Sequence, residues 1–189
     1  VLEDAVIDAG PRADDTVPDE FRIVHGENSI SVFVNDVGVF SSAEPVSISI
    51  LGSSDEDMLL FEGAATTCVY TFTGEEAGVV SLDGASVQFA SVETIASDMQ
   101  TAGAAFVFSP DDDTIVLRDA DNSGGTLTVL ESASSPPVFL PSYPETLIID
   151  SGEGTDRIDL SGSERDVTLR VDAGGVDGIM GGSGAITLL

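Results

Sequence analysis

The sequence predicts an all-β protein, and two observations carry that prediction. Apolar and polar residues alternate with a period of two in short runs, among them SISVFV (29–34), VSISIL (46–51), CVYTFT (68–73) and VTLRV (167–171). Helical spacing of apolar residues is nearly absent, while 20 glycines and many Ser, Asp and Asn clusters supply turns between the runs. The chain therefore reads as many short strands joined by tight turns.

The C-terminal tail contains a direct repeat. Residues 146–163 (TLIIDSGEGTDRIDLSGS) align with residues 168–183 (TLRVDAGGVDGIMGGS), with an offset of 22 residues at Thr146 and 21 at Asp156. Each copy is expected to form a strand, a glycine turn flanked by aspartates, and a second short strand. Looser copies upstream, at 13–17, 53–61 and 110–117, also place an Asp directly before a short apolar strand.

A second kind of unit alternates with the first. Residues 34–48, 81–95 and 136–149 each contain a β-rich stretch, then small residues, a glutamate (Glu44, Glu93 or Glu145) and another strand. A unit of 21–22 residues with a turn at each corner is the length of one coil of a parallel β-solenoid. An antiparallel β-sandwich is the alternative, because strands at its usual spacing give a similar local pattern.

We therefore expect one elongated repeat domain over residues 1–189, with units at roughly 1–45, 46–104, 105–160 and 161–189. No apolar run approaches the roughly 18 residues of a membrane span. The chain opens directly on VLEDAVIDAG, without an initiator Met or a signal peptide. This predicts a processed mature chain or a segment of a larger protein.

The charge balance restricts the partners. The chain has 34 acidic residues against six basic ones, all of them Arg, and a net charge of −28. Such a surface repels nucleic acid and anionic membranes, both of which require positive patches. It suits divalent cations, a salty medium or a surface that resists association.

No catalytic constellation is visible. Cys68 is the only cysteine, so no disulfide forms within the chain, and it is expected to be a small buried core residue. The only histidine, His25, follows a strand at an expected surface turn. Because the chain has 34 acidic residues, pairs of carboxylates are expected by chance and do not indicate a catalytic site. The nucleophile, zinc and phosphate-loop motifs are absent. We expect no enzymatic activity.

The stretch SGEGTDRID (151–159) resembles the glycine-rich nonapeptide G-G-x-G-x-D-x-U-x of the RTX, or haemolysin-type, calcium-binding repeats. Gly152, Gly154, Asp156 and Ile158 match this motif, and Ser151 replaces its first glycine. AGGVDGIM (173–180) keeps two glycines and Asp177 but lacks one residue of the turn. The likeness covers about 40 residues at the C-terminal end. More broadly, the chain is similar to long, acidic, lysine-poor surface repeat proteins of marine and salt-adapted bacteria.

This resemblance implies a Ca²⁺ site, because glycine turns expose carbonyl oxygens and stacked carboxylates repel each other unless a cation lies between them. Asp156 and Asp177 are expected to be neighbours on successive coils, with Asp150 and Asp172 as a second pair. A separate turn, DADNSGG (119–125), has the first half of a calcium loop. The alternative for every such Asp is a turn residue that caps local backbone N–H groups. The candidate metal ligands are Asp150, Gly152, Gly154, Asp156, Asp172, Gly174, Asp177, Asp119, Asp121 and Ser123.

Together these features predict an extracellular structural or adhesive repeat module, secreted and located at the cell surface, as part of a stalk, filament or surface layer. Its partners are expected to be like subunits or neighbouring repeats, with no nucleic acid and no membrane insertion. Open ends of a solenoid are exposed sheet edges, so head-to-tail assembly is expected. The alternative is a module that binds or processes carbohydrate, such as surface glycans, for which Tyr143 is the best-placed aromatic residue.

Overall fold

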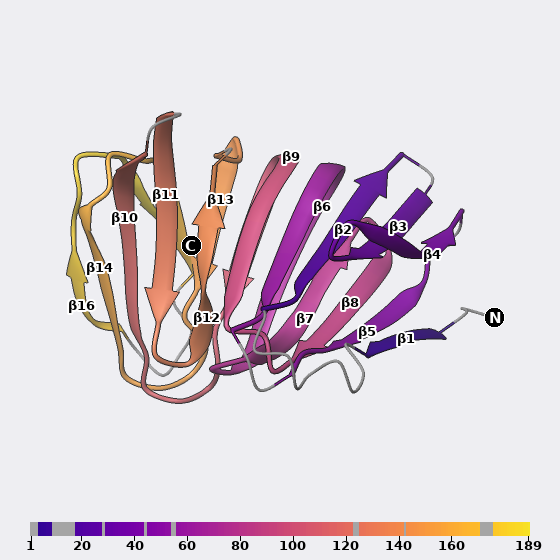
Figure 1. Ribbon diagram of the computed structural model, residues 1–189. Helices are drawn as coiled ribbons and strands as arrows, with labels where there is room; N and C mark the ends of the chain where they lie inside the picture. Colours follow the sequence, from indigo (N-terminus) through magenta and orange to yellow (C-terminus); the bar gives the residue numbers. More distant parts are fainter. Residues whose placement is uncertain are drawn as a thin grey trace.

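The computed structural model is an all-β protein, which confirms the predicted class (Figure 1). It describes residues 4–8, 18–27, 29–43, 45–53, 56–122, 125–141, 143–170 and 176–189. Within these ranges there is no helix that is long and apolar enough to cross a membrane. The sheet is mixed, with parallel and antiparallel pairs, so a parallel solenoid is not confirmed.

The first half of the chain forms β1 (Asp4–Asp8), β2 (Glu20–Gly26), β3 (Ser29–Val34), β4 (Val37–Ser42), β5 (Ser47–Leu51), β6 (Met58–Gly74), β7 (Ala77–Leu82), β8 (Ala85–Ala90) and β9 (Thr94–Val107). The second half forms β10 (Thr114–Asn122), β11 (Gly125–Ser132), β12 (Ser135–Leu140), β13 (Thr146–Asp150), β14 (Asp156–Gly162), β15 (Val167–Arg170), β16 (Val176–Met180) and β17 (Ile186–Leu188). The expected alternating runs all lie within or overlap these strands.

Strand pairing divides the sheet into two rows that share β6 and β9. Row I runs β4-β3-β2-β6-β9-β12-β11-β10-β14-β16 and uses the first halves of the two shared strands. Row II runs β1-β5-β8-β7-β6-β9-β13-β15-β17 and uses their second halves. The long strands β6 and β9 therefore pass from one row to the other.

The hydrophobic core lies between the two rows. Tyr70, in row II, packs edge-on against Phe61 of row I at 6.0 Å and donates a hydrogen bond to Ser97 Oγ of row I at 2.5 Å. It also stacks on Phe106 of the next strand at 4.7 Å. Cys68, two residues earlier on the same face, is buried in this core, and burial raises the pKa of its thiol to about 12. The thiol is therefore protonated and packed at neutral pH.

Neighbouring parallel strands place equivalent side chains beside one another. Along row II, parallel pairing aligns Tyr70, Phe106, Ile149, Leu169 and Leu188 in one column. The first four side chains are at most 1% exposed, so the column is a continuous part of the core. The same stacking aligns Ile115, Ile158 and Ile179 in row I.

The spacing between stacked residues differs slightly from the expected repeat. Ile149 pairs with Leu169 and Leu169 with Leu188, which are spacings of 20 and 19 residues, while Ile158 pairs with Ile179 at 21. Upstream, Ile115 pairs with Ile158 at 43 residues. The longer spacing arises because antiparallel segments are inserted between the parallel strands. These segments are β10-β11-β12 and β6-β7-β8.

Candidate functional site

Two turns that connect row II to row I lie side by side and form the strongest candidate site. We call residues 108–113, between β9 and β10, and residues 150–156, between β13 and β14, the Asp113–Asp156 corner. The Phe108 N–H donates to Asp150 O at 2.9 Å, and the Asp113 N–H donates to Asp156 Oδ1 at 2.9 Å. The Thr155 N–H donates to Asp112 Oδ1 at 2.9 Å. The later turn is thus hydrogen-bonded to the earlier one at both of its ends.

The two glycines of SGEGTD permit this close approach. Gly152 has φ +81°, and a Cβ there would lie 2.3 Å from Ser109 O. Gly154 has φ +111°, and a Cβ there would lie 2.8 Å from Asp111 O. Both residues need a left-handed backbone and no side chain, which only glycine supplies cheaply. The glycine pattern is therefore explained by packing of one turn on another, whatever the turn binds.

Three carboxylates at the corner are buried, those of Asp113, Asp150 and Asp156. Asp113 is 4% exposed, and its oxygens accept hydrogen bonds from the hydroxyls of Ser109, Ser132 and Ser134. Asp150 Oδ2 lies 3.5 Å from Arg170 Nη1, and Asp150 Oδ1 accepts from the Gly152 N–H at 3.3 Å. These groups have protein partners.

Asp156 is only partly satisfied. It is 1% exposed; Oδ1 accepts from the Asp113 N–H, but Oδ2 has no hydrogen-bond partner in the structure. The Ser151 hydroxyl, in the same turn and 1% exposed, also lacks a partner. Buried polar atoms without partners are costly, so the unpaired carboxylate oxygen is a candidate contact for a ligand with positive character.

A similar corner in the first half of the molecule is fully satisfied. Asp57 is 1% exposed; its Oδ1 accepts from the Asp19 N–H at 2.8 Å, and its Oδ2 from the Ser53 N–H at 2.5 Å. The Asp57 N–H in turn donates to Glu93 Oε2 at 2.6 Å. Burial raises the pKa of Glu93 above its ordinary value. In both corners, an acid placed before a strand therefore accepts the backbone N–H of the acid placed before the neighbouring strand.

The structure places the other predicted ligands differently. Asp119 lies within β10, where its carboxylate accepts from Thr128 Oγ1 at 2.8 Å and from the Glu164 N–H at 2.9 Å. Its Oδ1 is also 3.5 Å from Arg165 Nε. The backbone of Asp121 pairs with Thr126 in the β10–β11 hairpin, while its side chain and the whole of Ser123 lie outside the described residues.

The expected stacking of Asp150 on Asp172 is not the register that the strands adopt. Asp150 pairs with Arg170, two residues earlier than the sequence alignment indicated. Asp172 and Gly174 lie outside the described residues, as does the side chain of Asp177 in β16. Within the described part of the chain, no group of three or more His, Cys, Asp or Glu side chains has metal-binding geometry.

Sequence reasoning named Asp150, Gly152, Gly154 and Asp156 but missed the serines. Ser109, Ser132 and Ser134 reach Asp113 from turns that are separated along the chain, and no local signal links them. Asp113 did have a signal, because its Asp-before-strand motif lies 43 residues before that of Asp156, and the two are hydrogen-bonded.

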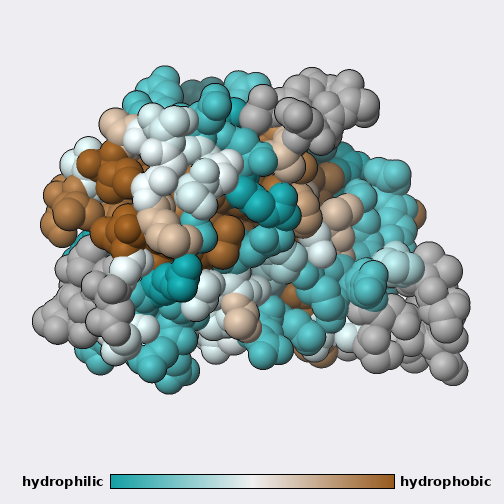
Figure 2. Space-filling view, turned by 90° about the vertical axis from the view of Figure 1, so that its left-hand side faces the viewer, coloured by the Kyte–Doolittle hydropathy of each residue, from teal (hydrophilic) through white to brown (hydrophobic). Residues whose placement is uncertain are grey.

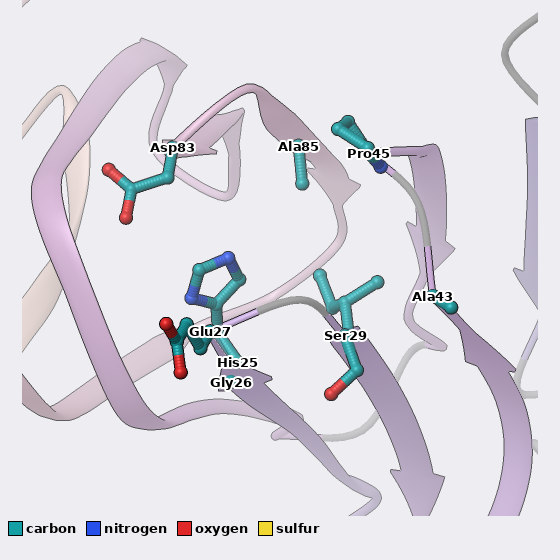
Figure 3. A pocket seen from close by; sticks show the side chains of 9 residues that line it. His25, Gly26, Glu27, Ser29, Ala43, Pro45, Asp83 and Ala85 are labelled. Atoms are coloured by element: carbon teal, nitrogen blue, oxygen red, sulfur yellow. The ribbon is translucent and has the colours of Figure 1, made fainter.

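A small pocket of about 220 Å³ lies near His25 (Figure 3). Glu27, Ser29 and Asp83 also line it, and the Asp83 carboxylate and the His25 ring lie on the same side of the pocket. His25 Nδ1 is 2.6 Å from Ala64 O, so this nitrogen carries the hydrogen. Asp83 accepts from the N–H groups of Thr66 at 2.7 Å and Thr67 at 3.1 Å.

These two side chains replace a missing strand. On one edge of β6 the partner changes from β2, which ends its pairing at Gly63, to β7, which begins at Cys68. His25 and Asp83 bind the backbone groups left between these points. Burial acts to raise the pKa of Asp83, but the hydrogen bonds from Thr66 and Thr67 and the nearby His25 hold it below its ordinary value. This arrangement accounts for both residues structurally.

Comparison of the chain with protein-family models, with curated proteins and with solved structures gave no match.

Proposed function

We propose that this chain is an extracellular structural module: a stiff, coil-stacked segment of a stalk, filament or surface layer, with no catalytic role. The observation that carries the proposal is the stacking of one coil on the next. Paired core residues and hydrogen bonds from backbone N–H groups to carboxylates join residues 36 to 43 positions apart. We interpret the parallel pairs β13–β15–β17 and β10–β14–β16 as short solenoid coils. A net charge of −28 would keep neighbouring modules from associating sideways.

We further propose that Ca²⁺ binds at the Asp113–Asp156 corner and stiffens the module. Asp156 Oδ2 and Ser151 Oγ are buried without partners, and Asp113 lies one hydrogen bond away. The chain has no lysine, and the ion pair of Arg170 at this corner is with Asp150 rather than with Asp156. Carboxylates, hydroxyls and backbone carbonyls are the oxygen ligands that Ca²⁺ prefers, and the turns supply all three.

Calcium is expected to raise the midpoint of thermal unfolding. A cation that binds only the folded state stabilises it by mass action, by about 2.7 kcal/mol when its concentration is 100 times Kd. The melt is followed by far-UV circular dichroism in EDTA, in a few millimolar Ca²⁺, and in Mg²⁺ at equal ionic strength. The Mg²⁺ sample measures simple charge screening.

Asp156→Asn should abolish the calcium-specific shift. Asp57→Asn is the matched control, because Asp57 is equally buried but both of its oxygens already accept backbone N–H groups. Its calcium shift should equal that of the wild type. Equal unfolding midpoints in EDTA, Mg²⁺ and Ca²⁺ would mean that the aspartates of the corner only cap backbone N–H groups. A calcium shift that is unchanged in Asp156→Asn would mean that the ion binds elsewhere.

The extracellular location has a separate test. An antibody raised against the folded chain should label intact cells of the organism that produces it, and the signal should fall sharply after mild surface proteolysis. Cells permeabilised before labelling serve as the control. Labelling that appears only after permeabilisation would contradict the proposed location.

No observation favours the carbohydrate-binding alternative. The Tyr143 hydroxyl donates to Asp166 O at 2.9 Å, and the Arg165 guanidinium lies 4.9 Å from the ring centre. Burial raises the pKa of Tyr143, consistent with a side chain packed against the core. All nine Phe and both Tyr lie in the described part of the chain, and none of them is exposed. A stacking platform for a sugar ring is therefore lacking there.

A further inference from the structure

The core columns are open at the C-terminal end of the stack. Leu169 is fully buried, but Leu188, its neighbour on the last coil, is 61% exposed. Ile158 is fully buried, and its neighbour Ile179 is 37% exposed. Residues of the kind that fill the interior of earlier strands thus face solvent on β16 and β17, because no further strand among the described residues covers them. Figure 2 shows apolar residues gathered in one patch on this side of the molecule.

Among the described residues, the large apolar side chains that are exposed lie on strands near the two ends of the rows. The described residues include nine large apolar side chains that are exposed. Four belong to the first strands of the rows, in β1, β4 and β5, and five to the last 11 residues. They are Val6, Val37, Val39 and Leu51 at one end, and Ile179, Met180, Ile186, Leu188 and Leu189 at the other. In Figure 1, β1 and β4 lie at one end of the molecule and β16 at the opposite end.

Each end also presents two free strand edges. At the C-terminal end, β16 pairs with β14 and β17 with β15, and no second partner exists among the described strands. At the N-terminal end, β4 pairs only with β3 and β1 only with β5 in the same part of the chain. An unpaired edge is a template for another strand. Each row therefore begins and ends on such an edge.

The free edges at the two ends run in matching directions. In row II, β1, β5 and β8 are parallel to one another. β7 is antiparallel to both β8 and β6, so β6 has the same direction as β8. The remaining pairs from β6 to β17 are parallel, and β1 and β17 therefore point the same way. In row I, the two antiparallel steps β4-β3-β2 and β12-β11-β10 have the same effect, so β4 and β16 also point the same way. If a second copy is translated along the stack, its β1 and β4 therefore run parallel to β17 and β16 of the first copy.

We propose that the partner of the C-terminal end is the N-terminal end of a second copy of this chain, with β17 beside β1 and β16 beside β4. This rests on the proposed structural function and specifies its interface. The contact covers the open columns at Ile179 and Leu188 with apolar residues such as Val39. Because the two surfaces differ, each copy retains one free end, and the assembly grows as an open filament rather than closing as a dimer.

The first measurement is sedimentation velocity over a wide range of protein concentration. It is made in EDTA, so that the Ca²⁺ proposal does not enter, and in about 0.15 M salt, where the Debye length is about 8 Å and repulsion between highly charged copies is screened. The wild type is expected to form a concentration-dependent ladder of oligomers, visible as filaments by electron microscopy. A monomer at every concentration would overturn the inference. It would not affect the calcium and location proposals, which are tested by the thermal melts and the surface labelling.

Two variants distinguish this head-to-tail contact from a symmetric one. Leu188→Asp removes the C-terminal surface and Val39→Asp the N-terminal surface, so each alone should be monomeric, with association weakened by about tenfold or more. Their mixture should form 1:1 dimers and stop, because it contains one intact surface of each kind. Dimers of either variant alone would overturn the head-to-tail assignment.

A third variant controls for added charge. Gln100→Asp introduces the same side chain on β9, in the middle of the rows, at an exposed position. It should assemble like the wild type. Both end variants should melt like the wild type at low concentration, because Leu188 and Val39 are already 61% and 49% exposed. Loss of assembly in Gln100→Asp would show that charge alone, rather than the end surfaces, governs association.

Discussion

Leu169→Ala is expected to lower the free energy of unfolding by about 2–5 kcal/mol, the usual cost of a buried leucine truncation. Leu169 is fully buried on β15, between Ile149 and Leu188 in the row II column. Removal of its side chain leaves a cavity between β13 and β17, whose backbones are fixed by their hydrogen bonds to β15, so the cavity cannot collapse freely. Urea denaturation followed by circular dichroism measures the change.

Leu188→Ala is the matched control, because it removes the same atoms from the next strand of the same column. Leu188 is 61% exposed, so in dilute solution its loss should cost well under the Leu169→Ala value. Equal costs for the two variants under monomeric conditions would contradict an open column at the C-terminal end. A cost for Leu188→Ala that grows with protein concentration would instead show that another copy covers this residue.

Gly152→Ala is the second large effect, with an expected loss of about 2–5 kcal/mol. A left-handed backbone costs an L-residue about 1–2 kcal/mol, and Gly152 has φ +81°. The added Cβ would also lie 2.3 Å from Ser109 O, and relief of that overlap must push the two turns of the Asp113–Asp156 corner apart at a further cost of about 1–3 kcal/mol. The same urea titration measures the loss.

Gly103→Ala provides the comparison. Gly103 lies inside β9, and a Cβ added there has no atom within 4 Å. Glycine inside a strand is destabilising by about 0.5–1 kcal/mol relative to alanine, so this variant should be neutral or slightly more stable. A Gly152→Ala protein as stable as the wild type would mean that the corner does not hold the turns in close contact.

Much of the local structure followed from the sequence. A period of two in SISVFV and VTLRV placed strands there, because one buried face demands alternation whatever the partner strand is. The glycines and Asp of SGEGTD indicated a tight corner, and Asp113 and Asp156 carried the same Asp-before-strand motif 43 residues apart. The sequence motif alone left two roles open for these acids, a calcium ligand or a cap for backbone N–H groups.

The direction of each strand and its partner did not follow from the sequence. Alternation is the same in parallel and antiparallel pairs, so the hairpins through β7 and β11 and the exchange of rows by β6 and β9 had no local signal. The alignment of Thr146 with Thr168 was two residues from the observed register, in which Ile148 faces Thr168. A shift of two keeps every side chain on its face, and hydrophobic pattern therefore cannot detect it.

By itself, then, the sequence determined the all-β class, the positions of the strands and the corners, and the excess of negative charge, because these depend on the character of neighbouring residues. Only the tertiary structure decided which acid meets which amide. Asp57 and Asp156 each accept one backbone N–H from a turn 38 or 43 residues away. Asp57 accepts a second from Ser53, four residues earlier, whereas Asp156 Oδ2 has no partner. It also decided which leucine is buried, since Leu169 lies between two paired strands, whereas Leu188 has a paired strand on one side only among the described residues.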